Sequence, residues 1–187
     1  MNSFSGELTQ ELETGRVVIQ YVSGKKHGPT KFFDHNGLVL SEITYKNDQI
    51  DGEVKQYGQS GSIISSIMYR EGIQHGPFIS FYENGMKQME SFYSEGKIDG
   101  ASVIFDEFGD VISKTQYHAG LKHGKSVVYY PKSQGGGIFE LSYYENGKLT
   151  GNMCRYYGTG EIMSVTPYTE GKAQAYPKNF SKTGEEI

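Results

Sequence analysis

The chain has 187 residues, with 18 lysines and arginines against 22 aspartates and glutamates, and a net charge of −4 at pH 7. This balance argues against a nucleic-acid-binding protein, which would carry a strongly basic face. Aromatic residues make up 13% of the chain, so it should fold, and its 25 glycines and 15 tyrosines indicate many tight turns between short strands. A single cysteine, Cys154, excludes an internal disulfide and a zinc site built from cysteines.

The first residues show no sign of a targeting segment. Met1–Glu7 has no charged stretch followed by an apolar one, and no apolar run approaches the roughly 18 residues that a membrane span needs. We therefore expect a soluble, cytoplasmic protein. Region 1–20 keeps the spacing of two later glycines in Gly6 and Gly15, but has Glu11 where later repeats have an aromatic residue. It is predicted to be a degenerate N-terminal cap.

Region 21–168 is organised by a repeat of 24 residues. The first glycine series is Gly28, Gly52, Gly76, Gly100 and Gly124, and a tyrosine series is Tyr21, Tyr45, Tyr69, Tyr93 and Tyr117. One interval is 27 residues long, because three residues are inserted near 133–137, and the series then continue with Gly151 and Tyr144. An aromatic residue also follows each of these glycines by five positions: Phe33, Tyr57, Phe81, Phe105, Tyr129 and Tyr156.

Each repeat predicts a β-hairpin. In the third repeat, Pro77–Tyr82 is rich in aromatic and β-branched residues, Glu83–Gly85 supplies a tight turn, Met86–Tyr93 is the return strand, and Ser94–Gly100 is a polar connection. A unit of 24 residues leaves no room for a helix beside two strands and two turns. The predicted fold class is therefore all-β, an elongated single-layer antiparallel sheet of tandem hairpins.

The last part of the chain, 169–187, supplies only half a repeat. Ala175 replaces the glycine, while Phe180 occupies the position of the recurring aromatic residue. We expect this segment to be a C-terminal partial repeat or cap, and residues 1–187 to form one repeat domain.

The repeat resembles a known family. Tyr69–Pro77 followed by Phe81–Gly85 looks like the MORN-repeat variant of bacterial proteins. The same sequence pattern recurs at Tyr93–Gly100 and Tyr144–Gly151. The resemblance covers about residues 16–187. It implies an elongated, twisted sheet of hairpins with a role in protein contacts. Many bacterial members, as in the YwqK-type group, are labelled antitoxin-like.

The histidines do not indicate a reactive site. His27, His75 and His123 share one repeat position, which alternates with Asp51 and Asp99. Equivalent positions in adjacent repeats are two strand spacings apart, about 9–10 Å. That distance is too long for a shared zinc ion or a catalytic His–Asp pair. We therefore expect no enzyme activity, no metal and no cofactor.

Two other repeat positions become aromatic only in the later repeats. They lie one residue past the recurring aromatic and one residue before the recurring tyrosine, and alternation places both on the second face of the sheet. Earlier repeats have Asp34 and Gly58 at the first of these positions. The predicted partner-binding residues are Tyr82, Phe92, Tyr130, Tyr143 and Tyr157, with Lys132 in the lengthened turn. The alternative is that sheet twist and neighbouring side chains cover both faces, so that these aromatics serve packing.

The sequence thus predicts a non-enzymatic protein-interaction module. Its partner would be a protein, and the resemblance suggests a toxin that this chain neutralises as an antitoxin or immunity factor. The rival hypothesis is a scaffold on an anionic membrane or the cell envelope, but lysines and acids mix in the turns, which is typical of a solvated face. A homodimer stays open, and no nucleic acid is expected.

Overall fold

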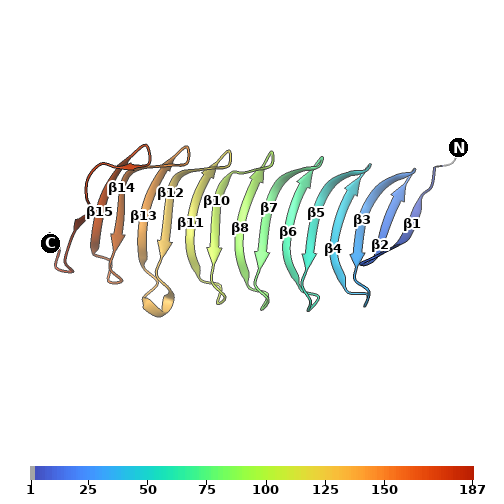
Figure 1. Ribbon diagram of the computed structural model, residues 1–187, viewed down its shortest axis with the longest axis horizontal. Coiled ribbons are helices and arrows are strands. Elements are labelled where there is room, and N and C mark those ends of the chain that lie inside the picture. The colour runs from blue at the N-terminus through green and yellow to red at the C-terminus, as the bar shows by residue number, and fades with distance from the viewer. Residues whose placement is uncertain (1–2) are drawn as a thin grey trace. The chain divides into compact units, whose positions relative to one another are not determined.

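The computed structural model describes residues 3–187, and residues 1 and 2, which open the expected N-terminal cap, lie outside the described part. In residues 3–187 the regular elements are strands and one short 3₁₀ turn, η1 (Lys132–Gln134). The all-β class is therefore confirmed (Figure 1). The strands are β1 (Gly6–Leu12), β2 (Gly15–Val22), β3 (Lys25–Phe33), β4 (Val39–Lys46), β5 (Gln49–Tyr57), β6 (Ile63–Arg70), β7 (Ile73–Phe81), β8 (Lys87–Ser94), β9 (Lys97–Ile98), β10 (Gly100–Phe105), β11 (Val111–His118), β12 (Leu121–Tyr129), β13 (Ile138–Glu145), β14 (Lys148–Tyr156), β15 (Ile162–Thr169), β16 (Lys172–Ala173) and β17 (Lys178–Asn179).

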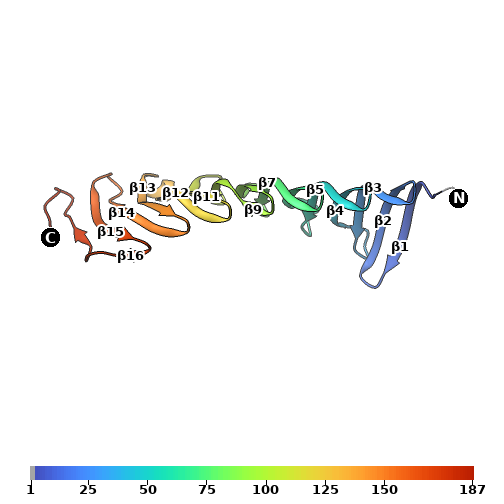
Figure 2. The same cartoon turned by 90° about the horizontal axis from the view of Figure 1, so that it is seen from above.

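The chain divides into two compact units. Unit 1 runs to Lys87 and includes Phe92–Lys97, whereas unit 2 consists of Gln88–Ser91 and Ile98–Ile187. In unit 1, each strand from β1 to β6 pairs antiparallel with the next one in the sequence, up to β7. In unit 2, the same succession joins β8, β10 and the strands up to β15, which also pairs with β16 and β17. Each unit is a sheet of successive hairpins (Figures 1 and 2).

The strands begin earlier than the repeat pattern suggests. Strand β7 starts at Ile73, four residues before the expected Pro77. The register between β6 and β7 shifts between Ile67 and Tyr69, so a bulge absorbs the extra residues. Gly76 lies in this bulge with φ of 119°, a backbone conformation that glycine adopts at little cost. The glycine therefore lets the strand continue where a loop was expected.

The tightest turns lie between the expected units rather than within them. Glu71 and Gly72 connect β6 to β7 with φ of 49° and 80°. Two consecutive residues with positive φ are typical of the type I′ turn, whose twist matches that of paired strands. The turn expected at Glu83–Gly85 is also present, because the Gly85 N–H donates to the Tyr82 carbonyl at 2.9 Å. It lies within a longer loop, which the Tyr82 N–H closes by donating to the Met86 carbonyl at 2.9 Å.

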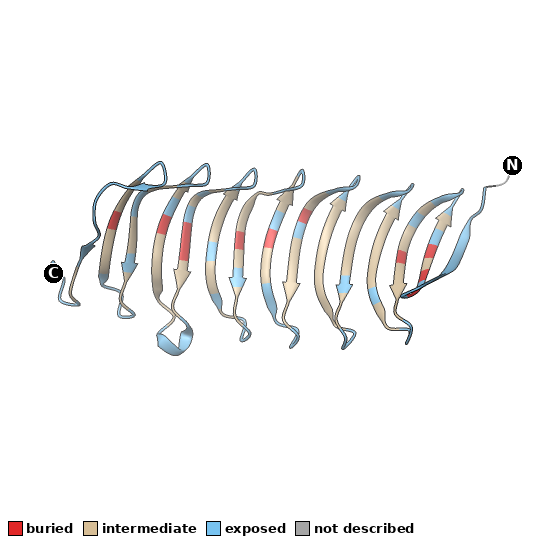
Figure 3. Ribbon diagram, viewed as in Figure 1, coloured by how far each residue is buried: buried red, intermediate tan, exposed pale blue. Residues whose placement is uncertain are grey.

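Strand alternation defines two faces in each unit. We call the face that carries the recurring tyrosines the tyrosine face, and the other the opposite face. In unit 1 the middle row of the tyrosine face consists of Ile19, Thr30, Ile43, Val54, Ile67 and Phe78. Two apolar side chains of this face, Val17 and Ile19, are only 4% and 6% exposed. Most buried positions lie in the middle of the strands (Figure 3).

In unit 2 the same middle row is mostly made of hydroxyl side chains. It consists of Ser91, Ser102, Thr115, Ser126, Ser142, Met153 and Thr166. The Ser91 hydroxyl donates to that of Ser102 at 2.9 Å, and the hydroxyls of Thr115 and Ser126 lie 2.8 Å apart. Buried polar groups need such partners. The tyrosine face therefore buries Val17 and Ile19 together with Thr30 in unit 1, and mostly hydroxyl side chains in unit 2, where two pairs of them are hydrogen-bonded.

Candidate protein-binding face

The opposite face of unit 2 carries apolar side chains at mid-strand. Val127 of β12 lies opposite Leu141 of β13, and Leu141 lies opposite Cys154 of β14. Cys154 in turn lies opposite Val165 of β15. Val103 of β10 holds the equivalent place further along this face. We call these five residues the apolar row; Val127 is buried, and the others are half-buried.

Two tyrosines border the apolar row. Tyr143 lies two residues from Leu141 on β13, and Tyr156 lies two residues from Cys154 on β14, so alternation places both on the opposite face. Burial raises the pKa of the Tyr156 hydroxyl above its ordinary value, and contributions from Cys154 and Tyr143 act in the same direction. Tyr143 is 41% exposed. Solvent thus reaches an aromatic ring beside the apolar row.

The opposite face of unit 1 has another character. Lys31 and Glu42 form an ion pair at 3.6 Å, and Lys55 lies 2.9 Å from Glu53. Burial opposes the charge of Glu53, but hydrogen bonds from Lys55 and from the Ser66 hydroxyl lower the pKa of its carboxyl group. Charged side chains therefore satisfy one another on this face of unit 1, whereas mostly apolar residues occupy its mid-strand positions in unit 2.

Tyr130 and Tyr157 have a role inside the fold. Both are half-buried, and their hydroxyls donate to backbone carbonyls of the following repeat, Tyr130 to Tyr156 and Tyr157 to Phe180, each at 2.8 Å. At the same repeat position, Asp34 accepts backbone N–H groups within its own turn. The change from aspartate to tyrosine therefore exchanges a local turn contact for a contact between repeats.

Replacing Tyr157 by phenylalanine is expected to lower the free energy of unfolding by about 0.5–1.5 kcal/mol, because it removes this hydrogen bond and keeps the ring. Urea unfolding of the purified variant measures the loss. Tyr176→Phe is the matched control, because Tyr176 is 94% exposed. Equal stability of both variants would contradict a structural role for the Tyr157 hydroxyl.

Three other predicted partner-binding residues lie outside the strands and unit that form the apolar row, or belong to a turn. Phe92 belongs to unit 1, is 45% exposed, and its ring lies 6.3 Å from that of His75. Tyr82 is half-buried where the loop after β7 begins. Lys132 lies in η1, and its Nζ is 2.5 Å from Asp110, which raises the pKa of the lysine. Among the predicted residues of unit 2, it is Tyr143 that borders the row.

Side chains at the repeat position shared by histidine and aspartate accept hydrogen bonds from backbone N–H groups of the turns. The Asp51 carboxylate accepts the Glu71 N–H at 3.1 Å, and His123 Nδ1 accepts the Asn146 N–H at 3.5 Å. The donors are residues of positive φ in the next tight turn. At Asp51, Asp99 and His123 this position thus supplies a hydrogen-bond acceptor, which both residue types can provide.

The repeat pattern did not predict one histidine contact, that of His118. His118 Nδ1 lies 3.4 Å from the Asp99 carboxylate, and its ring is 6.0 Å from that of His123. His118 lies outside the recurrent position, so the repeat pattern carried no signal for it. Across residues 3–187, no three histidine, cysteine or acidic side chains gather in a group suited to a metal ion.

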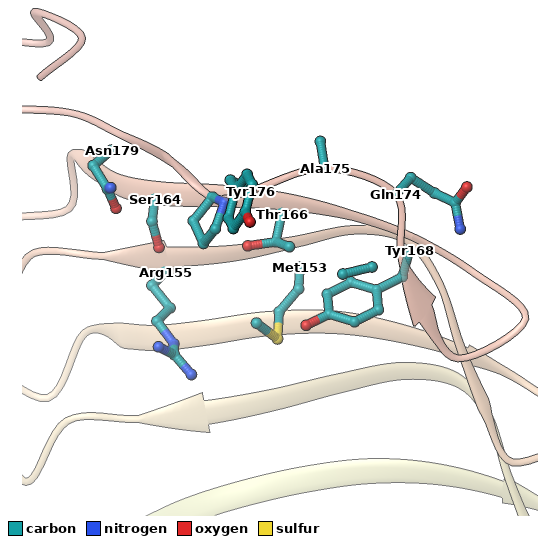
Figure 4. Close-up of a pocket in the computed structure, with 11 residues that line it drawn as sticks. Met153, Arg155, Ser164, Thr166, Tyr168, Gln174, Ala175, Tyr176 and Asn179 are labelled. Carbon is teal, nitrogen blue, oxygen red and sulfur yellow. The ribbon is translucent and has the colours of Figure 1, made fainter.

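A cavity of about 770 Å³ opens on the tyrosine face of unit 2 near the C-terminal end (Figure 4). Strands β16 and β17 both pair with β15, and the segment that connects them, which includes Ala175 and Pro177, is not part of either strand. This segment forms one wall of the cavity. Arg155 lines the cavity, but its guanidinium points away from Tyr176 in Figure 4 and pairs with Glu140 at 3.1 Å. The cavity therefore offers no unpaired charge from this arginine.

Comparisons with known proteins support the repeat assignment. Residues 26–47 and 74–95 match the family described as MORN repeat variant, and each segment spans two successive strands and the loop between them. The comparison with curated proteins finds no match. Among solved structures, a porin-like protein from Bacteroides uniformis ATCC 8492 is similar at 12% identity and a TM-score of 0.23, over 91% of this chain and 93% of that chain.

The matched segments support the interpretation of the sequence as a hairpin repeat of the MORN-variant kind. Two stretches carry the MORN-variant pattern, and both fold as hairpins of the kind the repeat predicted. The matched family does not specify an antitoxin group. No helix within residues 3–187 is long and apolar enough to cross a membrane.

Proposed function

We propose that this protein is a non-enzymatic protein-binding module that docks its partner on the opposite face of unit 2. The observation that supports it most directly is the contrast between the units. The same face carries ion pairs in unit 1 and the apolar row with Tyr143 in unit 2. Partly exposed apolar residues gathered on one face are typical of interaction sites.

The bordering tyrosine suits the centre of such an interface. Tyr143 brings a large ring and a hydroxyl, and tyrosine loses little side-chain entropy when a partner holds it. Interface anchors are enriched in tyrosine and lie beside well-packed residues that exclude water. Leu141 and Val127 provide this packing next to Tyr143 on the same face.

In this proposal the partner is a toxin, and the chain is its antitoxin or immunity factor. The support is the resemblance of the repeats to MORN-variant proteins labelled antitoxin-like, together with the two matched segments. The chain itself would act by covering a surface of the toxin rather than by chemistry.

Tyr143→Ala is expected to weaken partner binding by at least about thirtyfold, the effect of removing an interface anchor worth about 2 kcal/mol. The partner is first captured with the tagged full chain from the native cell, then purified, and its affinity is measured by calorimetry. Tyr176→Ala is the control, because this ring is 94% exposed and lies outside the apolar row.

Two results would count against the proposal. Unchanged affinity of the Tyr143 variant would remove the proposed face from the interface. Binding to anionic vesicles, in place of any protein, would favour the alternative of a membrane or envelope scaffold. Circular dichroism of each variant shows whether the fold is retained.

A further inference from the structure

Two lysines lie within the opposite face of unit 2. Lys114 of β11 lies opposite Val127 of β12 in the strand register, so the two share a face. Lys125 lies two residues before Val127 on β12, and it pairs with Tyr143 of β13. Both lysines are exposed. Two positive charges therefore border the buried valine and the exposed tyrosine of the candidate face.

Within residues 3–187, the side chain of neither lysine has an ion-pair or hydrogen-bond partner, although the backbone of both lies in paired strands. The lysines on the opposite face of unit 1 differ, because Lys31 and Lys55 each have a glutamate within 4 Å. By repeat spacing, Glu42 in unit 1 corresponds to two positions of unit 2, where Glu90 keeps the acid and Lys114 replaces it by a base. Unit 2 thus presents two uncompensated charges where unit 1 balances them internally.

A partner that covers this face must supply counter-charges or hydrogen bonds for both lysines. A lysine ammonium group placed under an apolar surface without a counter-charge loses its hydration and gains nothing in return. Carboxylates of the partner would restore the interaction and also set its register on the sheet. The apolar row needs the opposite chemistry, an aliphatic or aromatic side chain that packs against it.

We infer that the opposite face of unit 2 binds an acidic and apolar segment of a partner protein. An apolar side chain of the segment packs against Leu141 and Tyr143, and carboxylates on either side of it pair with Lys114 and Lys125. This inference rests on the proposed function and specifies the chemistry of the partner.

A protein segment fits these residues better than an anionic lipid surface. Each lysine adds about 1 kcal/mol of attraction near an anionic membrane, so two lysines contribute little against a net charge of −4. A polypeptide can place individual carboxylates at two defined points and an apolar side chain between them. The lipid surface is retained as an outcome of the test.

The test selects peptides from a random display library on the immobilised full-length protein. Peptides bound by the unchanged protein should be enriched in aspartate and glutamate around an aliphatic or aromatic residue. With Lys114→Glu and Lys125→Glu combined, the enrichment should turn to lysine and arginine. With Lys114→Gln and Lys125→Gln, the acidic preference should disappear and no basic preference should replace it.

The best acidic peptide then serves as the probe for affinity. We expect the double glutamate variant to bind it at least about tenfold more weakly, and added salt to reduce the binding to the unchanged protein. Lys46→Glu combined with Lys97→Glu is the matched control, because it changes the charge equally at exposed lysines in unit 1. Its affinity should equal that of the unchanged protein.

The outcomes separate this inference from the proposed function. Peptides that need Tyr143 but show no acidic enrichment overturn the inference and leave the protein-binding face intact. A library that yields no peptide dependent on Tyr143 overturns both. Vesicles of phosphatidylcholine with and without phosphatidylserine form the last arm, and lysine-dependent binding to the anionic vesicles alone overturns the inference in favour of lipid.

Discussion

Replacing Gly15 by alanine should destabilise the protein strongly, because the added methyl group has no room. Gly15 has φ of 141°, and a Cβ atom at this position would overlap the Phe33 carbonyl oxygen and lie 2.8 Å from the Asp34 carbonyl carbon. These are backbone atoms and cannot turn aside as a flexible side chain can. The loss in free energy of unfolding should exceed the roughly 1–3 kcal/mol that a strained backbone conformation costs by itself.

Gly37→Ala is the matched control for the steric part of this effect. Gly37 also has positive φ, at 85°, but a Cβ atom there would meet no atom within 4 Å. Its loss should stay within the range for backbone strain. Chemical denaturation of both variants measures the difference, and equal losses would show that the contact with residues 33 and 34 is unimportant.

Ile19→Ala is expected to cost about 2–5 kcal/mol, the range for truncating a buried isoleucine. Ile19 is 6% exposed in the middle row of the tyrosine face and lies opposite Leu8 and Thr30. A single sheet of hairpins has few buried apolar side chains, so the neighbours have little means of closing the cavity. Guanidinium unfolding followed by tyrosine fluorescence measures the change.

Ile73→Ala is the control with the same chemistry at an exposed site. Ile73 is 47% exposed at the start of β7, so its truncation should change stability by no more than about 0.5 kcal/mol. A loss at Ile73 as large as that at Ile19 would mean that the core of unit 1 does not lie on the tyrosine face.

The repeat spacing predicted the class of structure because it acts locally. A step of 24 residues with glycines at fixed places leaves room for two strands and two turns, and each unit folds as such hairpins. The turn predicted at Glu83–Gly85 is present, but the tightest turns lie in segments that were expected to be polar connections between hairpins. Asn84-Gly85 looks like a two-residue turn, but Glu71-Gly72 forms one, since a bulge at Gly76 lets β7 begin at Ile73. Bulges depend on the partner strand, which the local pattern does not describe.

The sequence also predicted the candidate face only in part. Alternation along β13 correctly placed Tyr143 on the face opposite the recurring tyrosines. The aromatic pattern also pointed to Tyr130 and Tyr157, whose hydroxyls are engaged by backbone carbonyls of the next repeat. The residue type alone cannot distinguish a tyrosine that anchors a partner from one that joins two repeats. Both roles use the ring for packing and the hydroxyl for a hydrogen bond.

The sequence by itself determined the all-β class, the hairpin period and the recurrence of tyrosines on one face, because each follows from spacing along a short stretch of chain. Only the tertiary structure decided where each face is apolar. Which side chains bury one another depends on the pairing of neighbouring strands, as when Val127 comes to lie between Lys114 and Leu141. The pairing also left Lys114 and Lys125 without counter-charges, because their neighbours in the register are uncharged valine and tyrosine.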